Sequence, residues 1–170
     1  MKWFWHGEIG IGKSTFLRRM LQAHGWNCPR GYATSWDENR RGADVIWLES
    51  WDHSVRRPFA KKKEPPASAE VPYALNEKGA LSAIQAACFS DEKIPLAIDE
   101  LGIIELQSSA AVDLIQRAVA SSENVMAIVQ NRALDHWKSV FHAVEISWLP
   151  LTLANRDHDP NFFLKSGVHS

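Results

Sequence analysis

Gly7-Glu8-Ile9-Gly10-Ile11-Gly12-Lys13-Ser14 is the stretch that decides the fold, because it has the spacing G-x-x-x-x-G-K-[ST] of a phosphate-binding loop. The apolar residues 2–6 before it predict a short buried strand, and the periodicity of residues 14–24 after it predicts a helix. The motif therefore lies where a strand meets a helix, which is the setting that such a loop requires. We interpret it as a nucleoside-triphosphate-binding loop.

The residue types of this loop fit the binding of a triphosphate. Glycines let the backbone wrap around phosphates with its N–H groups pointing inward, and a helix N-terminus favours negative charge. Lys13 is expected to reach the β- and γ-phosphates as a catalytic residue, and the Ser14 hydroxyl is expected to bind Mg²⁺. The order G-x-G-x-x-G of a dinucleotide site is absent. The predicted nucleotide-binding residues are Gly7, Glu8, Ile9, Gly10, Ile11, Gly12, Lys13, Ser14 and Thr15.

Two adjacent acids, Asp99 and Glu100, follow the apolar residues 94–98, a run typical of a buried parallel strand. Ligands of open α/β sheets bind at the carboxyl ends of such strands. We predict that Asp99 holds Mg²⁺ together with Ser14, and that Glu100 is a catalytic residue that orients or deprotonates the attacking water. Glu105 is either a further site residue or a solvated loop acid.

The rest of the sequence alternates strand and helix patterns, which predicts one domain over residues 1–170. We expect an α/β three-layer sandwich of the P-loop NTPase type, with a mostly parallel sheet, helices on both faces and an added antiparallel hairpin. Residues 52–72 are rich in proline and basic side chains, and we expect them to form a mobile surface loop. The further strands are expected at 32–36, 43–49, 94–98, 125–129 and 143–148, and the further helices at 76–87, 108–120 and 134–140.

The composition excludes several classes of protein. With 45% hydrophobic residues, 23% charged residues and a formal net charge of -1, the chain has no overall attraction for nucleic acid or for a membrane. It contains no long apolar stretch, and its two cysteines, Cys28 and Cys88, lack the paired spacing of a zinc site. We therefore expect a cytoplasmic protein in a reducing compartment.

Three segments resemble a known family. Residues 98–106 read I-D-E-L-G-I-I-E-L, residues 31–34 read G-Y-A-T, and residues 155–157 read N-R-D. Together with the phosphate-binding loop, they resemble the family of small P-loop nucleoside-triphosphatases that includes the human cancer-related nucleoside-triphosphatase. This resemblance implies slow, Mg²⁺-dependent hydrolysis of nucleoside triphosphates with little base preference. The chain departs from the family at Glu8, where relatives often have proline, and at Ile103, where they often have lysine.

Several arginines are candidates for neutralising the negative charge of the transition state. The sequence does not rank them against the alternative of a solvated surface charge. These candidates are Arg40, Arg41, Arg56, Arg57, Arg132 and Arg156. By resemblance, the loop 155–157 lies near the base of the nucleotide; an ordinary exposed turn is the alternative. The basic segment 56–63 is short and isolated, so we do not expect nucleic-acid binding.

The function that the sequence favours is Mg²⁺-dependent hydrolysis of nucleoside 5′-triphosphates to diphosphates and phosphate. A small-molecule kinase is the alternative enzyme, because it would use the same loop, with residues 52–72 as a lid over its acceptor. A nucleotide-dependent binding or assembly factor with little turnover is the alternative outside catalysis. The sequence identifies the nucleotide as a ligand and leaves a protein partner unknown.

Overall fold

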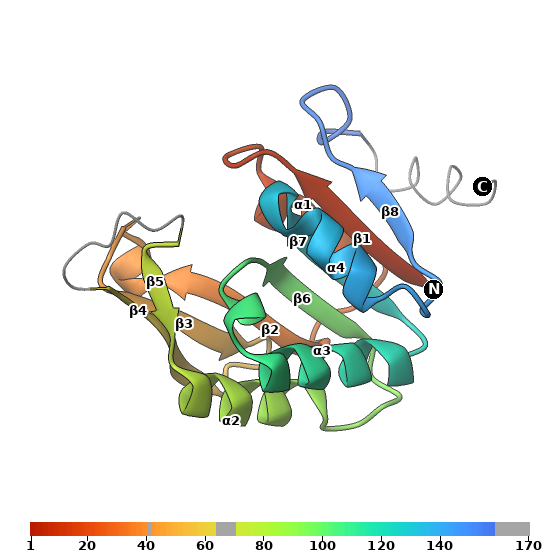
Figure 1. The fold of residues 1–170 in the computed structure, drawn as a ribbon. Coiled ribbons are helices and arrows are strands. Elements are labelled where there is room, and N and C mark those ends of the chain that lie inside the picture. Colours follow the sequence, from red (N-terminus) through yellow and green to blue (C-terminus); the bar gives the residue numbers. More distant parts are fainter. Residues whose placement is uncertain (41, 64–70, 159–170) are drawn as a thin grey trace.

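The computed structural model describes residues 1–40, 42–63 and 71–158. In this part of the chain an eight-stranded sheet of order β5-β4-β3-β2-β6-β7-β1-β8 has helices on both faces (Figure 1). The predicted α/β sandwich is confirmed. The strands are β1 (Lys2–Gly7), β2 (Arg30–Trp36), β3 (Val45–Ser50), β4 (Arg56–Lys62), β5 (Tyr73–Leu75), β6 (Leu96–Leu101), β7 (Val125–Gln130) and β8 (Ser147–Pro150). The helices are α1 (Lys13–Ala23), α2 (Glu77–Cys88), α3 (Ser109–Ser121) and α4 (Leu134–Val140).

The parallel part of the sheet consists of β2, β6, β7, β1 and β8. β1 pairs with β7 and β8, and β6 pairs with β7 and β2, in each case in the parallel sense. Residues 125–129 of β7 are all buried, as a continuous apolar run predicts for a strand covered on both faces. Because β7 lies between β1 and β6, the carboxyl ends of these three strands meet at one edge of the sheet.

The antiparallel part begins with the predicted hairpin of β2 and β3, in which Tyr32 pairs with Ser50 and Trp36 pairs with Ile46. It extends further than the sequence predicted, since β4 pairs with β3 and the short strand β5 pairs with β4. Strand β5 was not predicted.

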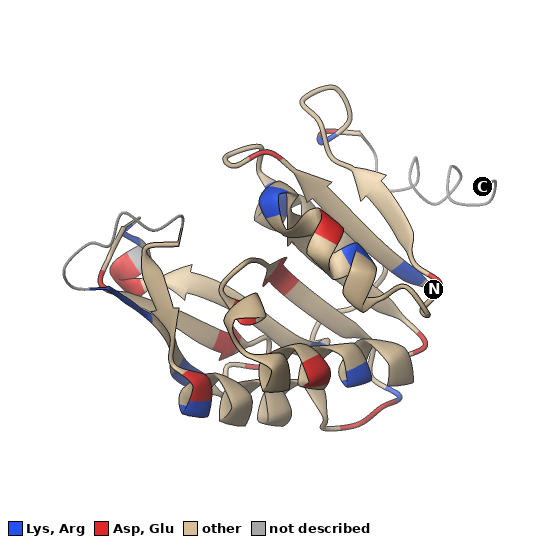
Figure 2. Cartoon of the chain, in the orientation of Figure 1, with Lys and Arg blue, Asp and Glu red and all other residues tan. Residues whose placement is uncertain are grey.

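The expectation of a surface loop over 52–72 is wrong for residues 56–62, which form β4. Basic residues on both sides obscure the strand pattern in the sequence. The short apolar centre of the strand, Phe59 and Ala60, is buried in the core beside α2. Pro58 is tolerated because β5 pairs only with residues 60–62, which leaves this stretch of β4 at an edge. The lysines and arginines of β4 lie at one end of the sheet (Figure 2). Residues 64–70 lie outside the described part of the chain.

Side chains alternate between two cores, one on each face of the sheet. On β1, Trp3 and Trp5 pack with α1, whereas Phe4 packs into the larger core shared with α2, α3 and α4. The four predicted helices are confirmed to within one residue at each end. None of the helices in the described ranges is both long and apolar enough to cross a membrane.

Several strand boundaries differ from the sequence prediction, and two of the differences bear on the site. The last strand begins at Ser147 rather than at residue 143, because the chain first turns out of α4, where the N–H of Val144 donates to the carbonyl of Phe141. Asp99 and Glu100 lie within β6 rather than beyond its end. The apolar run alone did not reveal that the strand continues through these two acids.

Gly31 gives a direct test of this packing. Its φ is +105°, and a Cβ at this position would lie 2.0 Å from the carbonyl oxygen of Ala97 on the neighbouring strand. We expect Gly31→Ala to lower the free energy of unfolding by about 3 kcal/mol or more, from steric overlap and left-handed strain together. Gly25→Ala is the matched control, because Gly25 has a φ of +70° and no neighbour within 4 Å. Urea unfolding of both variants measures the difference, and equal losses would contradict the close approach of β2 and β6.

Candidate active site

The phosphate-binding loop connects β1 to α1. Gly7 ends β1, residues 8–12 form the turn, and Lys13, Ser14 and Thr15 begin α1. Gly10 and Gly12 have φ values of +83° and +89°, which favour glycine. No side chain caps the N-terminus of α1, and its first turn contains no acidic residue. The backbone N–H groups at this end of α1 are therefore available to an anion such as a phosphate.

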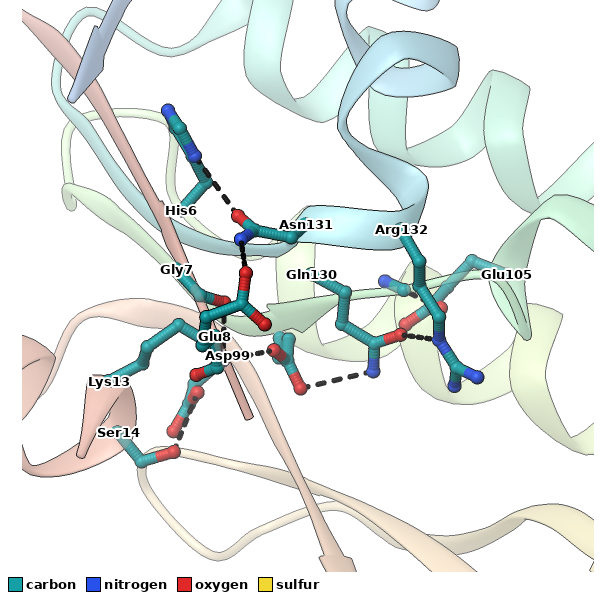
Figure 3. Close-up of polar contacts among 12 residues, drawn as sticks. His6, Gly7, Glu8, Lys13, Ser14, Asp99, Glu105, Gln130, Asn131 and Arg132 are labelled. Carbon is teal, nitrogen blue, oxygen red and sulfur yellow. Dashed lines mark hydrogen bonds and ion pairs between the residues drawn. The ribbon is translucent and has the colours of Figure 1, made fainter. Parts of the chain in front are cut away.

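The side chain of Lys13 is held by contacts with the loop and with Glu100. Its Nζ donates to the carbonyl oxygens of Gly7 and Glu8, each at 3.1 Å, and forms an ion pair of 3.4 Å with Oε1 of Glu100 (Figure 3). The side chain is buried, whereas 25% of the Glu100 side chain is exposed. The ammonium group thus lies between the phosphate-binding loop and the acids of β6.

Ser14 and Asp99 are brought into contact across the strand ends. The hydroxyl of Ser14 donates to Oδ1 of Asp99 at 3.1 Å. Burial raises the pKa of Asp99 to about 6, although the hydrogen bond from Ser14 acts in the opposite direction. The hydroxyl and carboxylate oxygens form the hard oxygen donor set that Mg²⁺ prefers, so these two residues fit the predicted metal.

Glu100 is oriented by a residue that sequence reasoning missed. Nε2 of Gln130 donates to Oε2 of Glu100 at 3.1 Å, and Nε of Arg132 donates to Oε1 of Gln130 at the same distance. The space beside Gly102 is filled by the Gln130 side chain, since a Cβ there would lie 2.8 Å from Gln130 Cδ. A polar residue at the carboxyl end of the 125–129 strand was the available signal, because β7 lies next to β6.

The side chain of Glu8 is held by Asn131. Nδ2 of Asn131 donates to Oε1 of Glu8 at 2.7 Å, and Nδ1 of His6 lies 3.1 Å from Oδ1 of Asn131 (Figure 3). These three side chains form a polar cluster that lines the smaller of two cavities beside the loop. Asn131 was not predicted as a site residue; it follows Gln130 at the end of β7.

Two cavities lie beside the loop. The smaller, of about 620 Å³, is lined by residues 6–11, by Asn131 and by residues 150–154. The larger, of about 910 Å³, begins at Ser14, Asp99 and Glu100 and extends over β2 and β3. Residues of the phosphate-binding loop therefore border both cavities, and Ile9 lines the two of them.

The sequence profile of the NTPase family matches residues 2–162. The chain belongs to the NTPase family. Two solved structures have the same fold: THEP1 from the hyperthermophile Aquifex aeolicus (22% identity, TM-score 0.70, covering 99% of this chain and 100% of that one) and a human cancer-related nucleoside triphosphatase (18% identity, TM-score 0.65, covering 98% and 97%). A search of the curated proteins finds no match. Membership of the NTPase family, which confirms the resemblance seen in the sequence, supports nucleoside-triphosphatase activity.

The arginine candidates differ in their positions in this member of the NTPase family. Arg132 is linked to Glu100 through Gln130, and Arg156 donates to the carbonyl of Ile11 in the loop at 3.2 Å. Arg56 stacks over Trp47, and Arg57 donates to a neighbouring carbonyl on β4. Arg40 follows a turn after β2 and is not one of the described residues that line the two cavities. Arg41 lies outside the described ranges.

The loop 155–157 lies against the phosphate-binding loop rather than apart from it. Asn155 closes its turn by accepting the N–H of Thr152 at 2.7 Å and donating to the carbonyl of Pro150. Arg19 of α1 donates to the carbonyl of Arg156 at 3.1 Å. These contacts attach the chain after β8 to both the loop and α1.

Glu105 is a buried acid and not a solvated one. Only 2% of it is exposed, and its Oε2 accepts the N–H of Gly102 at 3.0 Å. Burial raises its pKa to about 7, and the nearby Glu100 adds to this shift. It also borders the larger cavity.

Gln130→Ala tests whether this side chain positions Glu100. We expect kcat for triphosphate hydrolysis to fall about tenfold with little change in nucleotide affinity, as is usual when a supporting hydrogen bond to an active group is lost. Steady-state kinetics and equilibrium nucleotide binding separate the two effects. Gln85→Ala, at an exposed position on α2, is the matched control. An unchanged kcat in Gln130→Ala would show that Glu100 needs no such partner.

Glu105 predicts a pH dependence of stability. Because its pKa is about 7 in the folded protein and 4.5 in its ordinary environment, the folded state binds more protons than the unfolded chain between these values. The free energy of unfolding therefore falls as pH rises through this window. Glu105→Gln keeps an acceptor for the N–H of Gly102 and removes the ionisable group. The melting temperature of the variant minus that of the unmodified protein should therefore increase from pH 5 to pH 8. A difference that is constant with pH would contradict the buried, neutral carboxyl.

Proposed function

We propose that this chain hydrolyses nucleoside 5′-triphosphates to diphosphates and phosphate in a Mg²⁺-dependent reaction. The single observation that carries the proposal is the convergence of the loop and the β6 acids: Ser14 contacts Asp99 at 3.1 Å, and Lys13 pairs with Glu100 at 3.4 Å. A loop that holds phosphates and an acid that faces the γ-phosphate are the two parts that hydrolysis needs.

The phosphates are held by the N–H groups at the start of α1 and by Lys13. On binding, the Lys13 ammonium exchanges its contacts with Gly7 and Glu8 for the β- and γ-phosphates. Ser14 and Asp99 would hold the Mg²⁺, which would neutralise phosphate charge. A bound cation would favour the ionised form of Asp99, against the burial that raises its pKa.

Glu100 orients the attacking water and accepts its proton. Gln130 fixes one of its carboxylate oxygens, and Lys13 pairs with the other. Arg132, which holds Gln130 at 3.1 Å, is the candidate that we propose for neutralising charge on the transferred phosphoryl group. Water then enters from the larger cavity, which Glu100 and Arg132 both border.

The smaller cavity supports a broad base preference. It adjoins the phosphate-binding loop, and its wall over 150–154 is made of Pro150, Leu151, Thr152, Leu153 and Ala154. Four of these five side chains are apolar, and apolar side chains pack against any base without reading its hydrogen-bonding edge. We therefore propose that ATP, GTP, CTP and UTP are all substrates.

Phosphate release from these four triphosphates tests the proposal. Lys13→Ala and Glu100→Gln are each expected to lower kcat at least about 100-fold, the usual loss for a catalytic group, and chelation of Mg²⁺ should abolish turnover. Lys78→Ala and Glu123→Gln are matched controls at exposed positions and should retain full activity. Nucleotide binding without phosphate release by the unmodified protein would refute hydrolysis as the function.

A further inference from the structure

The larger cavity is more spacious than hydrolysis requires. Its volume is about 910 Å³, whereas one water occupies about 30 Å³ of liquid. Ser14, Asp99 and Glu100, which we propose meet the metal and the γ-phosphate, line it, and the smaller cavity is left for the nucleoside part of the triphosphate. Cavities of this size commonly bind a small molecule. A second ligand placed here would meet the γ-phosphate.

Aromatic rings line the part of the cavity that is formed by the antiparallel strands. Trp51 is fixed there because its Nε1 donates to the carbonyl of Ala97 at 2.9 Å. Trp36 and Tyr73 also line the cavity and hold each other edge to face, with ring centroids 5.1 Å apart. Fixed aromatic rings of this kind bind planar rings by stacking or edge contacts.

Polar side chains also line this cavity. Thr34 and Ser35 of β2 line the cavity, and their hydroxyls form no hydrogen bond with any side chain or backbone group in the described ranges. Glu49 of β3 also lines it and has one carboxylate oxygen paired with His53 at 2.6 Å. Hydroxyl and carboxylate groups in this position suit a ligand that carries several hydroxyls.

We propose that the larger cavity binds a nucleoside as a phosphoryl acceptor, which makes the protein a nucleoside kinase as well as a hydrolase. The base lies by the aromatic rings, the sugar lies by Thr34 and Ser35, and one sugar hydroxyl faces Glu100. This inference rests on the proposed function, since the acceptor replaces the attacking water at the same triphosphate site.

The transfer uses only groups already described. The sugar hydroxyl oxygen forms a bond to the γ-phosphorus, and the bond from that phosphorus to the β–γ bridging oxygen breaks. The leaving nucleoside diphosphate keeps the electron pair, and the hydroxyl proton passes to the carboxylate of Glu100. The products are a nucleoside monophosphate and a nucleoside diphosphate.

The test uses the full chain with Mg²⁺ and ATP labelled at the γ-phosphate. Adenosine, guanosine, cytidine, uridine and thymidine are each added at about 1 mM, the upper end of ordinary KM values, and labelled nucleoside monophosphate is separated from labelled phosphate. With at least one nucleoside, we expect labelled nucleoside monophosphate to form faster than labelled phosphate. Absence of labelled monophosphate with all five overturns the proposal, while release of labelled phosphate without any nucleoside reports separately on hydrolysis.

A variant that narrows the cavity locates the acceptor. Ser35→Tyr places a ring in the cavity away from the phosphate-binding loop, and we expect it to lower transfer at least about tenfold while hydrolysis changes less than about twofold. Ser82→Tyr is the matched control, at an exposed position on α2. Transfer that is equal in Ser35→Tyr and the unmodified protein overturns the assignment to this cavity. Should Ser35→Tyr fail to fold, label transfer in the unmodified protein still decides the proposal.

Discussion

The hydrogen bond from Ser14 to Asp99 joins segments 85 residues apart in the sequence, and the site depends on it. It forms because β7 lies between β1 and β6, so that the loop after β1 and the acids of β6 reach the same edge of the sheet. The parallel pairing of these strands fixes the separation of the two segments. Phosphate-binding groups and acids are thereby held on rigid elements, which is the arrangement that precise chemistry requires.

Carboxyl groups that are costly to bury are concentrated at this edge of the sheet. Asp99 and Glu105 are both buried carboxyls with raised pKa values, and Glu100 lies beside them with Lys13 as its ion-pair partner. A sheet built for stability alone would have apolar residues in these positions. Buried carboxyl groups that destabilise the protein without a ligand, but bind favourably to a cation and a triphosphate, are typical of a functional site.

Much of this arrangement was predictable from local patterns. The loop, its flanking elements and the acids at 99–100 were predicted because glycine spacing and apolar runs are local signals. Strand β4 was missed because five basic residues surround its short apolar centre in the sequence, and its pairing with β3 is a tertiary effect. Gln130 and Asn131 were missed for a related reason: their roles follow from the neighbours of β7 in the sheet, which the order of elements along the chain does not reveal.

A crystal structure of the protein with Mg²⁺ and a non-hydrolysable ATP analogue tests the central claim most directly. The account predicts a metal bound to Oγ of Ser14 at about 2.1 Å, with Asp99 beside it, the γ-phosphate at Lys13 and a water between Glu100 and the γ-phosphorus. A triphosphate bound elsewhere, or a metal that contacts neither Ser14 nor Asp99 directly or through water, would contradict it.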